Sequence, residues 1–292
     1  MTSRVMQDFD LLLPESVPEV LELLADHKDN CAILSGGTDL LVALKFDYAV
    51  DNVVSLALVP GLDGLIFDPD QGLSIGARVT IADIVKSQDV KTYYPALWQA
   101  AKVFATPQLR NTATVLGNIM RASPAGDCSL ALYALGGKLR LKSASGARDV
   151  SLDDFWLSYG VTARQSNELA ISLRVPPPVA GQKSAFQRMT RTTEDLSKIN
   201  AAVSLTMSDG VCLSARVAMG CVGPTLIRLP RVEAMLGGAE ITEDLLGQVS
   251  DMVAAEITPI DDIRSSADYR RKVAGVLVRR VINLAFTEGN NQ

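Results

Sequence analysis

The sequence is poor in the side chains that many enzymes use for acid–base work and metal binding. Its single histidine among 292 residues, His27, falls at the end of a predicted helix. A histidine there is typical of a solvated helix end, so the chain offers a poor candidate for histidine-based proton transfer. The few cysteines are far apart and form no Cys-x-x-Cys pair, which argues against structural zinc and an iron–sulfur cluster within the chain. Buried thiols in a reducing cytoplasm are the simpler interpretation of Cys31, Cys128, Cys212 and Cys221.

Two further absences limit the class of partner. The formal net charge is −5, so nothing indicates binding to nucleic acid or to an anionic membrane surface. No run of 18 apolar residues is present, so we expect no membrane span. Residues 1–16 carry acidic residues within their apolar stretch and lack a small-residue cleavage site. We therefore expect no secretory leader and a cytoplasmic location.

What is present has the composition of a globular chain, with 48% hydrophobic and 21% charged residues. Its length suits one large domain or two to three smaller ones. Predicted strands and helices alternate up to a strand at 168–175, and Ser16 and Thr80 are predicted to cap the helices that follow them. Residues 176–181, Pro-Pro-Pro-Val-Ala-Gly, are the clearest linker, because proline cannot continue a sheet ladder. Beyond it, a hairpin at 201–220 turning at Asp209-Gly210 and several helices indicate a separate α+β domain. The helices are predicted at 231–238, 242–257 and 266–286.

A glycine-containing turn at residues 35–39, Ser-Gly-Gly-Thr-Asp, follows a short apolar strand. Its glycines can adopt positive φ, and successive N–H groups in such a turn form a concavity that suits a pyrophosphate. The alternative is an ordinary strand–turn with a glycine pair, since short glycine motifs occur often. The turn is neither a Gly-x-Gly-x-x-Gly dinucleotide motif nor a phosphate loop with Gly-Lys-Ser/Thr.

A second polar segment covers residues 106–127, TPQLRNTATVLGNIMRASPAGD, between apolar stretches. Gly117 and Gly126 allow close backbone approach, and Asp127 could accept a hydrogen bond from a ribose hydroxyl or a ring N–H. A surface loop without a ligand is the alternative, although long loops in compact domains are often functional. Further hydrogen-bonding groups come from Thr112, Thr114, Asn118 and Ser123.

Two charged segments have simpler explanations. In residues 188–201, Lys198 or an arginine could face a ligand, but a solvated charged turn leading into a strand explains the composition. Residues 268–281 combine basic side chains with apolar ones at helical spacing. An amphipathic terminal helix is favoured there over a membrane-binding or partner-binding stripe, given the acidic total.

With these motifs in place, the chain resembles the FAD-binding medium subunit of the molybdenum hydroxylases. That family includes carbon monoxide dehydrogenase, nicotinate dehydrogenase, 4-hydroxybenzoyl-CoA reductase and xanthine dehydrogenase. Residues 35–40 match its Ala/Ser-Gly-Gly-Thr/His-Asp/Ser-Leu turn. Residues 110–118 and 122–127 match its Arg-Asn-x-Ala-Thr-x-Gly-Gly-Asn and Ala-Ser-Pro-x-x-Asp motifs. The segments 153–176, 219–238 and 268–282 are also similar, so the likeness covers nearly the whole chain. The cysteine-rich insert of the 4-hydroxybenzoyl-CoA reductase subunit is missing, which makes that subfamily a poor match.

The resemblance implies an α+β fold in two domains. The first, residues 1–177, would be a two-part α/β FAD-binding domain of the vanillyl-alcohol-oxidase (PCMH) type, with subdomains at about 1–57 and 58–177. The second, residues 178–292, would be a smaller α+β domain of the CO-dehydrogenase flavoprotein type.

The resemblance also implies where FAD is held. The turn at 35–39 would bind the pyrophosphate together with groups from the second loop, and Asp127 would lie toward the ribose or adenosine. Leu169 and Ala170 would flank the ring system, and Lys198 would reach the flavin. The full predicted set of cofactor-binding residues is Leu34, Ser35, Gly36, Gly37, Thr38, Asp39, Leu40, Thr106, Ala113, Thr114, Leu116, Gly117, Asn118, Met120, Ser123, Gly126, Asp127, Leu169, Ala170 and Lys198.

Leu116 departs from the family pattern, because the first glycine of Gly-Gly-Asn usually stands there. A leucine does not adopt positive φ cheaply, so we expect an ordinary backbone at Leu116 or a local difference in the loop. FAD binding is expected to survive, because Gly117 and Asn118 remain. On the same interpretation, Gly37→Val should abolish flavin retention because the new side chain would fill the pyrophosphate's approach.

The function implied by the resemblance is electron transfer. A large molybdenum-cofactor subunit would hydroxylate the substrate, and a small subunit would carry two [2Fe–2S] clusters, in a dimer of heterotrimers. This chain would pass electrons through FAD to an external acceptor, and would need no catalytic residue or metal of its own. Two alternatives stay open: a stand-alone FAD-dependent oxidoreductase of the same fold, and a flavin-free assembly subunit. The residues identify neither the organic substrate nor the acceptor, which could be NAD, quinone, ferredoxin or oxygen.

Overall fold

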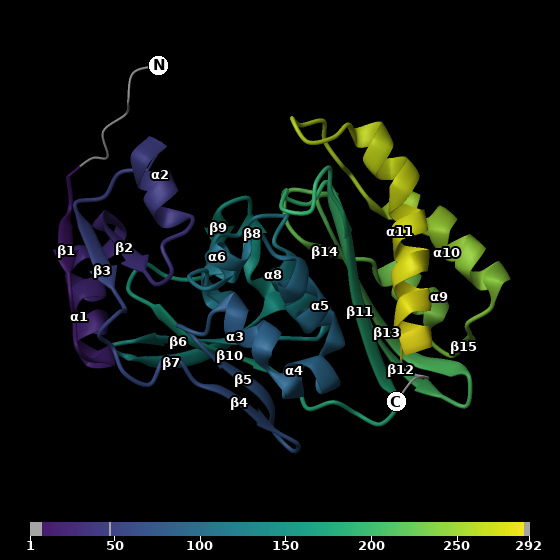
Figure 1. Cartoon of the computed structure of the whole chain (residues 1–292), viewed down its shortest axis with the longest axis horizontal. Helices are drawn as coiled ribbons and strands as arrows, with labels where there is room; N and C mark the ends of the chain where they lie inside the picture. Colours follow the sequence, from purple (N-terminus) through teal and green to yellow (C-terminus); the bar gives the residue numbers. More distant parts are fainter. Residues whose placement is uncertain (1–7, 47, 289–292) are drawn as a thin grey trace.

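The computed structural model describes residues 8–46 and 48–288, and three sheets follow one another along its long axis (Figure 1). No secretory leader is expected in residues 1–16, and residues 1–7 of that segment lie outside the described residues. Residues 289–292 of the predicted second domain also lie outside them. Within the described part, no helix is long and apolar enough to cross a membrane. The mixture of helices and sheets confirms the predicted α+β fold class.

The first sheet is parallel, with strand order β1-β3-β2. Helix α1 begins after Ser16, whose side chain accepts a hydrogen bond from the backbone N–H of Glu19, which confirms the predicted cap. Strand β2 ends immediately before the turn at 35–39, so the sheet presents that turn at its carboxyl edge. The elements are β1 (Asp10–Leu12), α1 (Val17–His27), the 3₁₀ turn η1 (Lys28–Asn30), β2 (Cys31–Leu34), α2 (Leu40–Phe46) and β3 (Asn52–Ser55).

The second sheet is antiparallel, with strand order β4-β5-β10-β6-β7. Its strands are β4 (Leu65–Asp68), β5 (Gly72–Gly76), β6 (Lys138–Ser143), β7 (Gly146–Ser151) and β10 (Leu169–Val175). A small hairpin of β8 (Trp156–Ser158) and β9 (Val161–Thr162) follows the 3₁₀ turn η2 (Leu152–Asp154). The connections thus bring residues 156–170 back beside the segment 106–127.

Six helices of the described chain accompany this sheet. The predicted helix starting after Thr80 is confirmed, and Thr80 and Asp83 form a reciprocal capping box. The polar segment 106–127 is not one long loop, because it contains two short helices, α6 and α7. The helices are α3 (Ile81–Lys86), α4 (Gln88–Tyr93), α5 (Pro95–Val103), α6 (Pro107–Arg110), α7 (Val115–Met120) and α8 (Asp127–Ala134).

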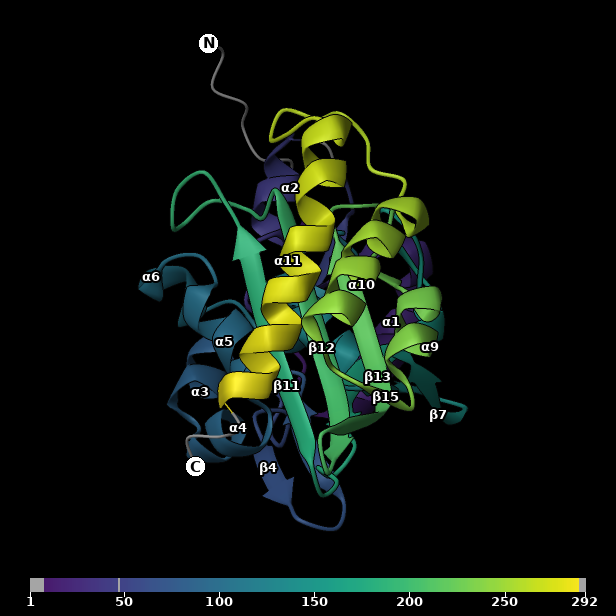
Figure 2. The same cartoon turned by 90° about the vertical axis from the view of Figure 1, so that its right-hand side faces the viewer.

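The third sheet has strand order β11-β12-β13-β14, with β15 pairing to β13. The predicted hairpin is confirmed: Asp209 and Gly210, with φ of 48° and 85°, join β12 to β13. Helices α10 and α11 cover the outer face of this sheet (Figures 1 and 2), and α5 and α8 pack on its inner face. The elements are β11 (Gln182–Met189), β12 (Ile199–Ser208), β13 (Val211–Gly220), β14 (Ile227–Arg228), α9 (Pro230–Leu236), β15 (Ala239–Glu240), α10 (Glu243–Glu256) and α11 (Ala267–Glu288).

The largest hydrophobic core contains residues from all three sheets, which divide the chain into three parts. It runs from α1 through the second sheet and α5 to α8, and includes Phe186, Ala202 and Ala218 from the inner face of the third sheet. A separate core lies between the outer face of that sheet and α9 to α11. Because the third sheet contributes to both cores, its packing helps to fix the segment 106–127, which runs into α8.

Candidate cofactor-binding site

A cavity of about 510 Å³ lies where the first two parts of the chain meet. Its size is within the usual range for small-molecule sites. Both glycine-containing segments line it, through residues 35–40 and through residues 113, 114, 116–118, 120 and 121. Leu169 and Ala170 at the start of β10 complete part of the opposite wall. The structure therefore brings together two segments that are about 75 residues apart in the chain, as their polar character suggested.

Gly36 is the point at which the two segments touch. A Cβ added to Gly36 would lie 2.1 Å from the backbone oxygen of Thr112 and 3.2 Å from the Cα of Ala113. No side chain larger than hydrogen fits that contact. Ser35 fixes the same turn to the second sheet, because its hydroxyl donates to the carbonyl of Ala77 at 3.2 Å. The turn is thus anchored on both sides by its own residues.

Gly37 is constrained for a different reason from the one predicted. Its φ is 72°, a conformation that favours glycine, and an added Cβ would lie 2.9 Å from Leu34 Cδ1 and 3.2 Å from Leu41 Cδ1. The first obstacle to Gly37→Val is therefore backbone strain and a collision with two leucines. Loss of flavin remains the expected result of that substitution, measured as the flavin-to-protein ratio after purification.

The predicted residues at the start of α7 use their side chains to order the second segment. Thr114 caps the helix, with its hydroxyl oxygen accepting from the backbone N–H of Gly117 at 3.1 Å. A Cβ at Gly117 would lie 2.7 Å from that oxygen. Asn118 accepts from the backbone N–H and the hydroxyl of Ser129, at 3.1 and 2.8 Å, and so joins α7 to α8. These contacts within the protein shape the cavity wall.

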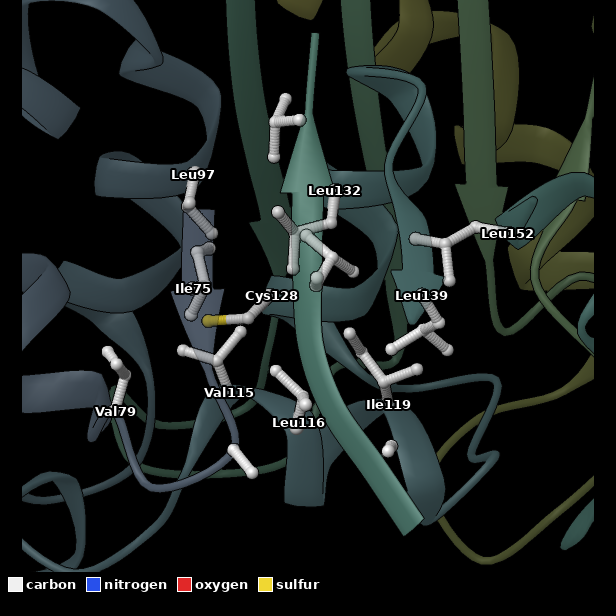
Figure 3. Packing of buried hydrophobic residues seen from close by; sticks show 14 of the residues in the cluster. Ile75, Val79, Leu97, Val115, Leu116, Ile119, Cys128, Leu132, Leu139 and Leu152 are labelled. Atoms are coloured by element: carbon white, nitrogen blue, oxygen red, sulfur yellow. The ribbon is translucent and has the colours of Figure 1, made fainter. Parts of the chain in front are cut away.

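Leu116 has an ordinary helical backbone, as expected for a leucine at this position. It belongs to α7 and is not among the residues with positive φ. The residue is 2% exposed and packs in the large core, and Figure 3 shows it among Val115, Ile119 and Cys128. The leucine that departs from the family pattern therefore packs in the hydrophobic core.

Six predicted residues lie outside the described lining of the cavity: Leu34, Thr106, Ser123, Gly126, Asp127 and Lys198. Thr106 caps α6, and Ser123 accepts from the backbone N–H of Ala125 at 3.2 Å. Gly126 is the N-cap residue of α8. The ammonium of Lys198 lies 5.9 Å from the ring centroid of Tyr269 in the third part of the chain. Their contacts with a cofactor stay predictions.

Asp127 is engaged in a buried cluster that joins α8 to the third sheet. Its carboxylate accepts from Arg188 Nη1 at 2.8 Å, Ser197 Oγ at 2.7 Å and Asn200 Nδ2 at 2.6 Å. Both charged side chains are under a tenth exposed. Burial raises the pKa of the Asp127 carboxyl, and the Arg188 charge and the three hydrogen bonds act in the opposite direction. Asp127 thus connects the segment 106–127 to the third sheet.

Several lining residues were missed by the sequence reasoning. Tyr48 and Phe104 bring aromatic rings to the cavity, and Arg121 and Arg164 bring charge. Arg121 belongs to the polar segment 106–127, and Phe104 stands two residues before it. Their closeness in sequence to that segment could have predicted that they line the cavity. Tyr48 and Arg164 reach the cavity only through the tertiary fold.

Glu168 stabilises the wall that carries Leu169. Its carboxylate accepts from Arg148 Nε at 2.7 Å and from the backbone N–H of Gln165 at 2.7 Å. The hydrogen bond from Arg148 lowers the pKa of the Glu168 carboxyl, with burial opposing it and the Gln165 N–H adding to it. Glu168 is 5% exposed, whereas the Arg148 side chain is 43% exposed and partly screened by solvent.

The stability that Glu168 contributes should therefore depend on pH. Its folded pKa is depressed, so the contribution is present above the unfolded value of about 4.3 and is lost as pH falls through the lower folded value. We expect Glu168→Gln to lower the free energy of unfolding by about 1–2 kcal/mol at pH 7. Urea unfolding at several pH values checks this. The difference between variant and parent should shrink below about pH 4, and a constant difference would contradict the assignment.

Comparison with known proteins gives the same assignment over both parts of the chain. Residues 7–178 match the family described as "FAD binding domain in molybdopterin dehydrogenase", and residues 184–285 match "CO dehydrogenase flavoprotein C-terminal domain". The carbon monoxide dehydrogenase medium chain of Hydrogenophaga pseudoflava is 30% identical over 279 residues, which cover 95% of this chain and 97% of that one. The nicotinate dehydrogenase FAD-subunit of Eubacterium barkeri is 28% identical, covering 96% and 97%.

Solved structures agree with these sequence relatives. Carbon monoxide dehydrogenase from Hydrogenophaga pseudoflava, in a form lacking the Mo-pyranopterin moiety, matches with a TM-score of 0.93 and 30% identity over 97% of this chain and 98% of that chain. Quinoline 2-oxidoreductase from Pseudomonas putida 86 matches with a TM-score of 0.89 and 28% identity over 96% and 98%. The chain therefore belongs to the FAD-binding medium subunits of the molybdenum hydroxylase family, and it is an oxidoreductase subunit whose cofactor is FAD.

Proposed function

We propose that this chain holds FAD in the cavity between the turn at 35–39 and the segment 106–127, and that it is the electron-transfer subunit of a molybdenum hydroxylase. The contact at Gly36 carries this proposal, because it brings the backbone of both segments to one wall with no side chain between them. The turn lines the cavity, the backbone N–H groups of such a turn suit a diphosphate, and the hydroxyl of Thr38 adds a further donor. Phe104, Leu169 and Ala170 offer apolar surface to the flavin ring system.

FAD and the protein have different roles in the proposed function. Bound FAD supplies the redox chemistry, since a flavin takes up and releases electrons singly or in pairs, and the protein supplies binding and orientation. Among the described residues, no group of three or more His, Cys, Asp or Glu side chains could hold a metal ion. We infer that residues 1–177 form the FAD-binding domain and residues 178–292 the C-terminal domain of the subunit.

The names of the relatives support partner subunits, because several are medium chains or subunits of dehydrogenases and one is the medium subunit of a hydroxylase. We propose a large subunit with the molybdenum cofactor and a small subunit with two [2Fe–2S] clusters, assembled as a dimer of heterotrimers in the cytoplasm. Electrons from the clusters would reach this chain and leave it to an external acceptor. Steady-state assays of the whole complex with NAD, a quinone analogue, ferredoxin or oxygen would identify that acceptor.

The absorption spectrum of the purified chain tests the proposal. We expect flavin bands in the chain alone or in the chain co-expressed with its partner subunits. Their absence from both preparations would contradict FAD binding and favour a flavin-free assembly subunit. Flavin accompanied by substrate turnover in the isolated chain would instead favour a stand-alone oxidoreductase.

A further inference from the structure

The charges that line the cavity are few and unevenly placed. Among the described lining residues, Asp39, Arg121 and Arg164 carry a charge. The diphosphate of FAD brings negative charge into the cavity, and burying an anion without a cation nearby is costly. The placement of the two arginines therefore decides how the charge of the diphosphate is balanced. This argument rests on the proposed FAD site.

Arg164 is committed to partners within the protein. Its Nη1 donates to the carbonyls of Gln165 and Glu168, at 2.9 and 2.7 Å. Its positive charge acts first on Glu168, whose carboxyl pKa it helps to lower, and then on Tyr48 and Cys31. Arg164 is thus already engaged by backbone carbonyls and by the charge of Glu168.

Arg121 lies beside the turn itself. It follows Met120 at the end of α7, and its Nε is 3.6 Å from Asp39 Oδ1. Its Nη2 donates to the Tyr159 hydroxyl at 3.0 Å, and its guanidinium carbon lies 5.3 Å from the Tyr159 ring centroid. The next turn residue, Gly160, donates its N–H to the carbonyl of Ala122 at 3.1 Å. The β8–β9 turn is therefore fastened beside Arg121 and holds its guanidinium against the cavity.

The pair of Arg121 and Asp39 is loose. A distance of 3.6 Å exceeds that of a charge-assisted hydrogen bond, and the two side chains are 39% and 61% exposed. Exposed pairs of this kind contribute little to stability. The Asp39 carboxylate cannot bind a diphosphate, because both are anions, so only its backbone can serve the pyrophosphate. A diphosphate at the turn would compete with Asp39 for the same guanidinium.

We propose that Arg121 is the specificity-determining cation for the diphosphate of FAD, kept beside the turn by Tyr159 and by a temporary ion pair with Asp39. On FAD binding, the guanidinium exchanges Asp39 for the diphosphate. The residue then distinguishes FAD from riboflavin, which has the same ring system and no phosphate. A guanidinium suits this task because its planar N–H groups can donate in pairs to phosphate oxygens.

Equilibrium binding to the flavin-free full chain tests the proposal, with flavin fluorescence as the readout. We expect Arg121→Gln to weaken FAD binding about tenfold or more, equivalent to about 1.4 kcal/mol or more, and to leave riboflavin binding unchanged. Arg121→Lys should recover part of the FAD affinity. Arg140→Gln is the matched control, because Arg140 also belongs to an exposed ion pair, with Asp149 at 3.1 Å, and does not line the cavity.

The outcomes distinguish a failure of the proposed FAD binding from a failure of the proposed role of Arg121. A parent chain that binds no FAD would overturn the proposed function. A parent that binds FAD, with Arg121→Gln within twofold of it, would overturn the role of Arg121 alone. Equal losses for FAD and riboflavin would also overturn it, because they indicate a misshapen cavity. Asp39→Asn should bind FAD at least as tightly as the parent, and a tenfold loss would overturn the exchange of partners.

Discussion

Replacing Gly36 by alanine is expected to abolish FAD retention in a chain that still folds. The new methyl group would lie 2.1 Å from the backbone oxygen of Thr112 and 2.9 Å from its carbonyl carbon. Neither atom belongs to a flexible side chain, so one of the two cavity walls must move. Gly36 does not have positive φ, and the effect is therefore one of space and not of backbone conformation.

The size of the effect should differ between binding and stability. Overpacking of this kind costs about 1–3 kcal/mol, less than the 5–15 kcal/mol that usually separates folded from unfolded domains. The variant should therefore remain folded by circular dichroism, while its flavin-to-protein ratio after gel filtration falls close to zero. The displaced wall carries the backbone groups proposed to receive the diphosphate, so a small shift removes several contacts together.

Gly64→Ala is the control for the Gly36 variant. Gly64 also lacks positive φ, and its added Cβ would meet only Ile66 side-chain atoms, at 3.7 and 3.9 Å. We expect this control to keep its full flavin content. If Gly36→Ala retains as much flavin as Gly64→Ala, the contact between the two segments does not form the cofactor site.

The features that the sequence predicted well are local ones. Ser16 and Thr80 cap helices where their side chains reach a backbone N–H three residues ahead. Asp209 and Gly210 form a two-residue turn between strongly patterned strands. Each depends on neighbours within a few residues, so composition and spacing are sufficient to identify it.

Short helices and tertiary contacts were harder to predict. Helices α6 and α7 have four and six residues, too few turns for a periodic pattern to emerge, and they depend on the caps supplied by Thr106 and Thr114. The pairing of Arg121 with Asp39 joins residues 82 positions apart, and no local pattern encodes it. The family resemblance located the two cavity walls, whereas the charges between them required the fold.

Asp127 has a structural role that its place in the motif does not predict. The family resemblance implies a contact of Asp127 with the ribose or adenosine, and that contact stays a prediction. In the structure, the carboxylate partners Arg188, Ser197 and Asn200, which lie 61 to 73 residues further along the chain. Arg188 also donates to the carbonyls of Val103, Thr193 and Asp195. The cluster therefore links α5, α8 and the third sheet.

Asp127→Ala should consequently be among the most destabilising single substitutions in this chain. It leaves the Arg188 guanidinium, 8% exposed, without its counter-ion, and removes the acceptor of two further hydrogen bonds. Breaking a buried pair in this way costs about 3–5 kcal/mol, measurable as a loss in the free energy of unfolding in urea. Asp149→Ala, which breaks an exposed pair with Arg140, should cost about 1 kcal/mol or less.

A double variant distinguishes the cost of leaving a buried charge unpaired from the cost of lost packing. If the cost of Asp127→Ala arises from the stranded Arg188 charge, then Asp127→Leu combined with Arg188→Met should be less destabilised than Asp127→Ala, because no buried charge is left. Asp127 begins α8, and α8 holds Asn118 through Ser129, so the same loss should also loosen the cavity wall and lower flavin content. An Asp127→Ala variant no less stable than Asp149→Ala would show that this cluster does not hold α8 against the third sheet.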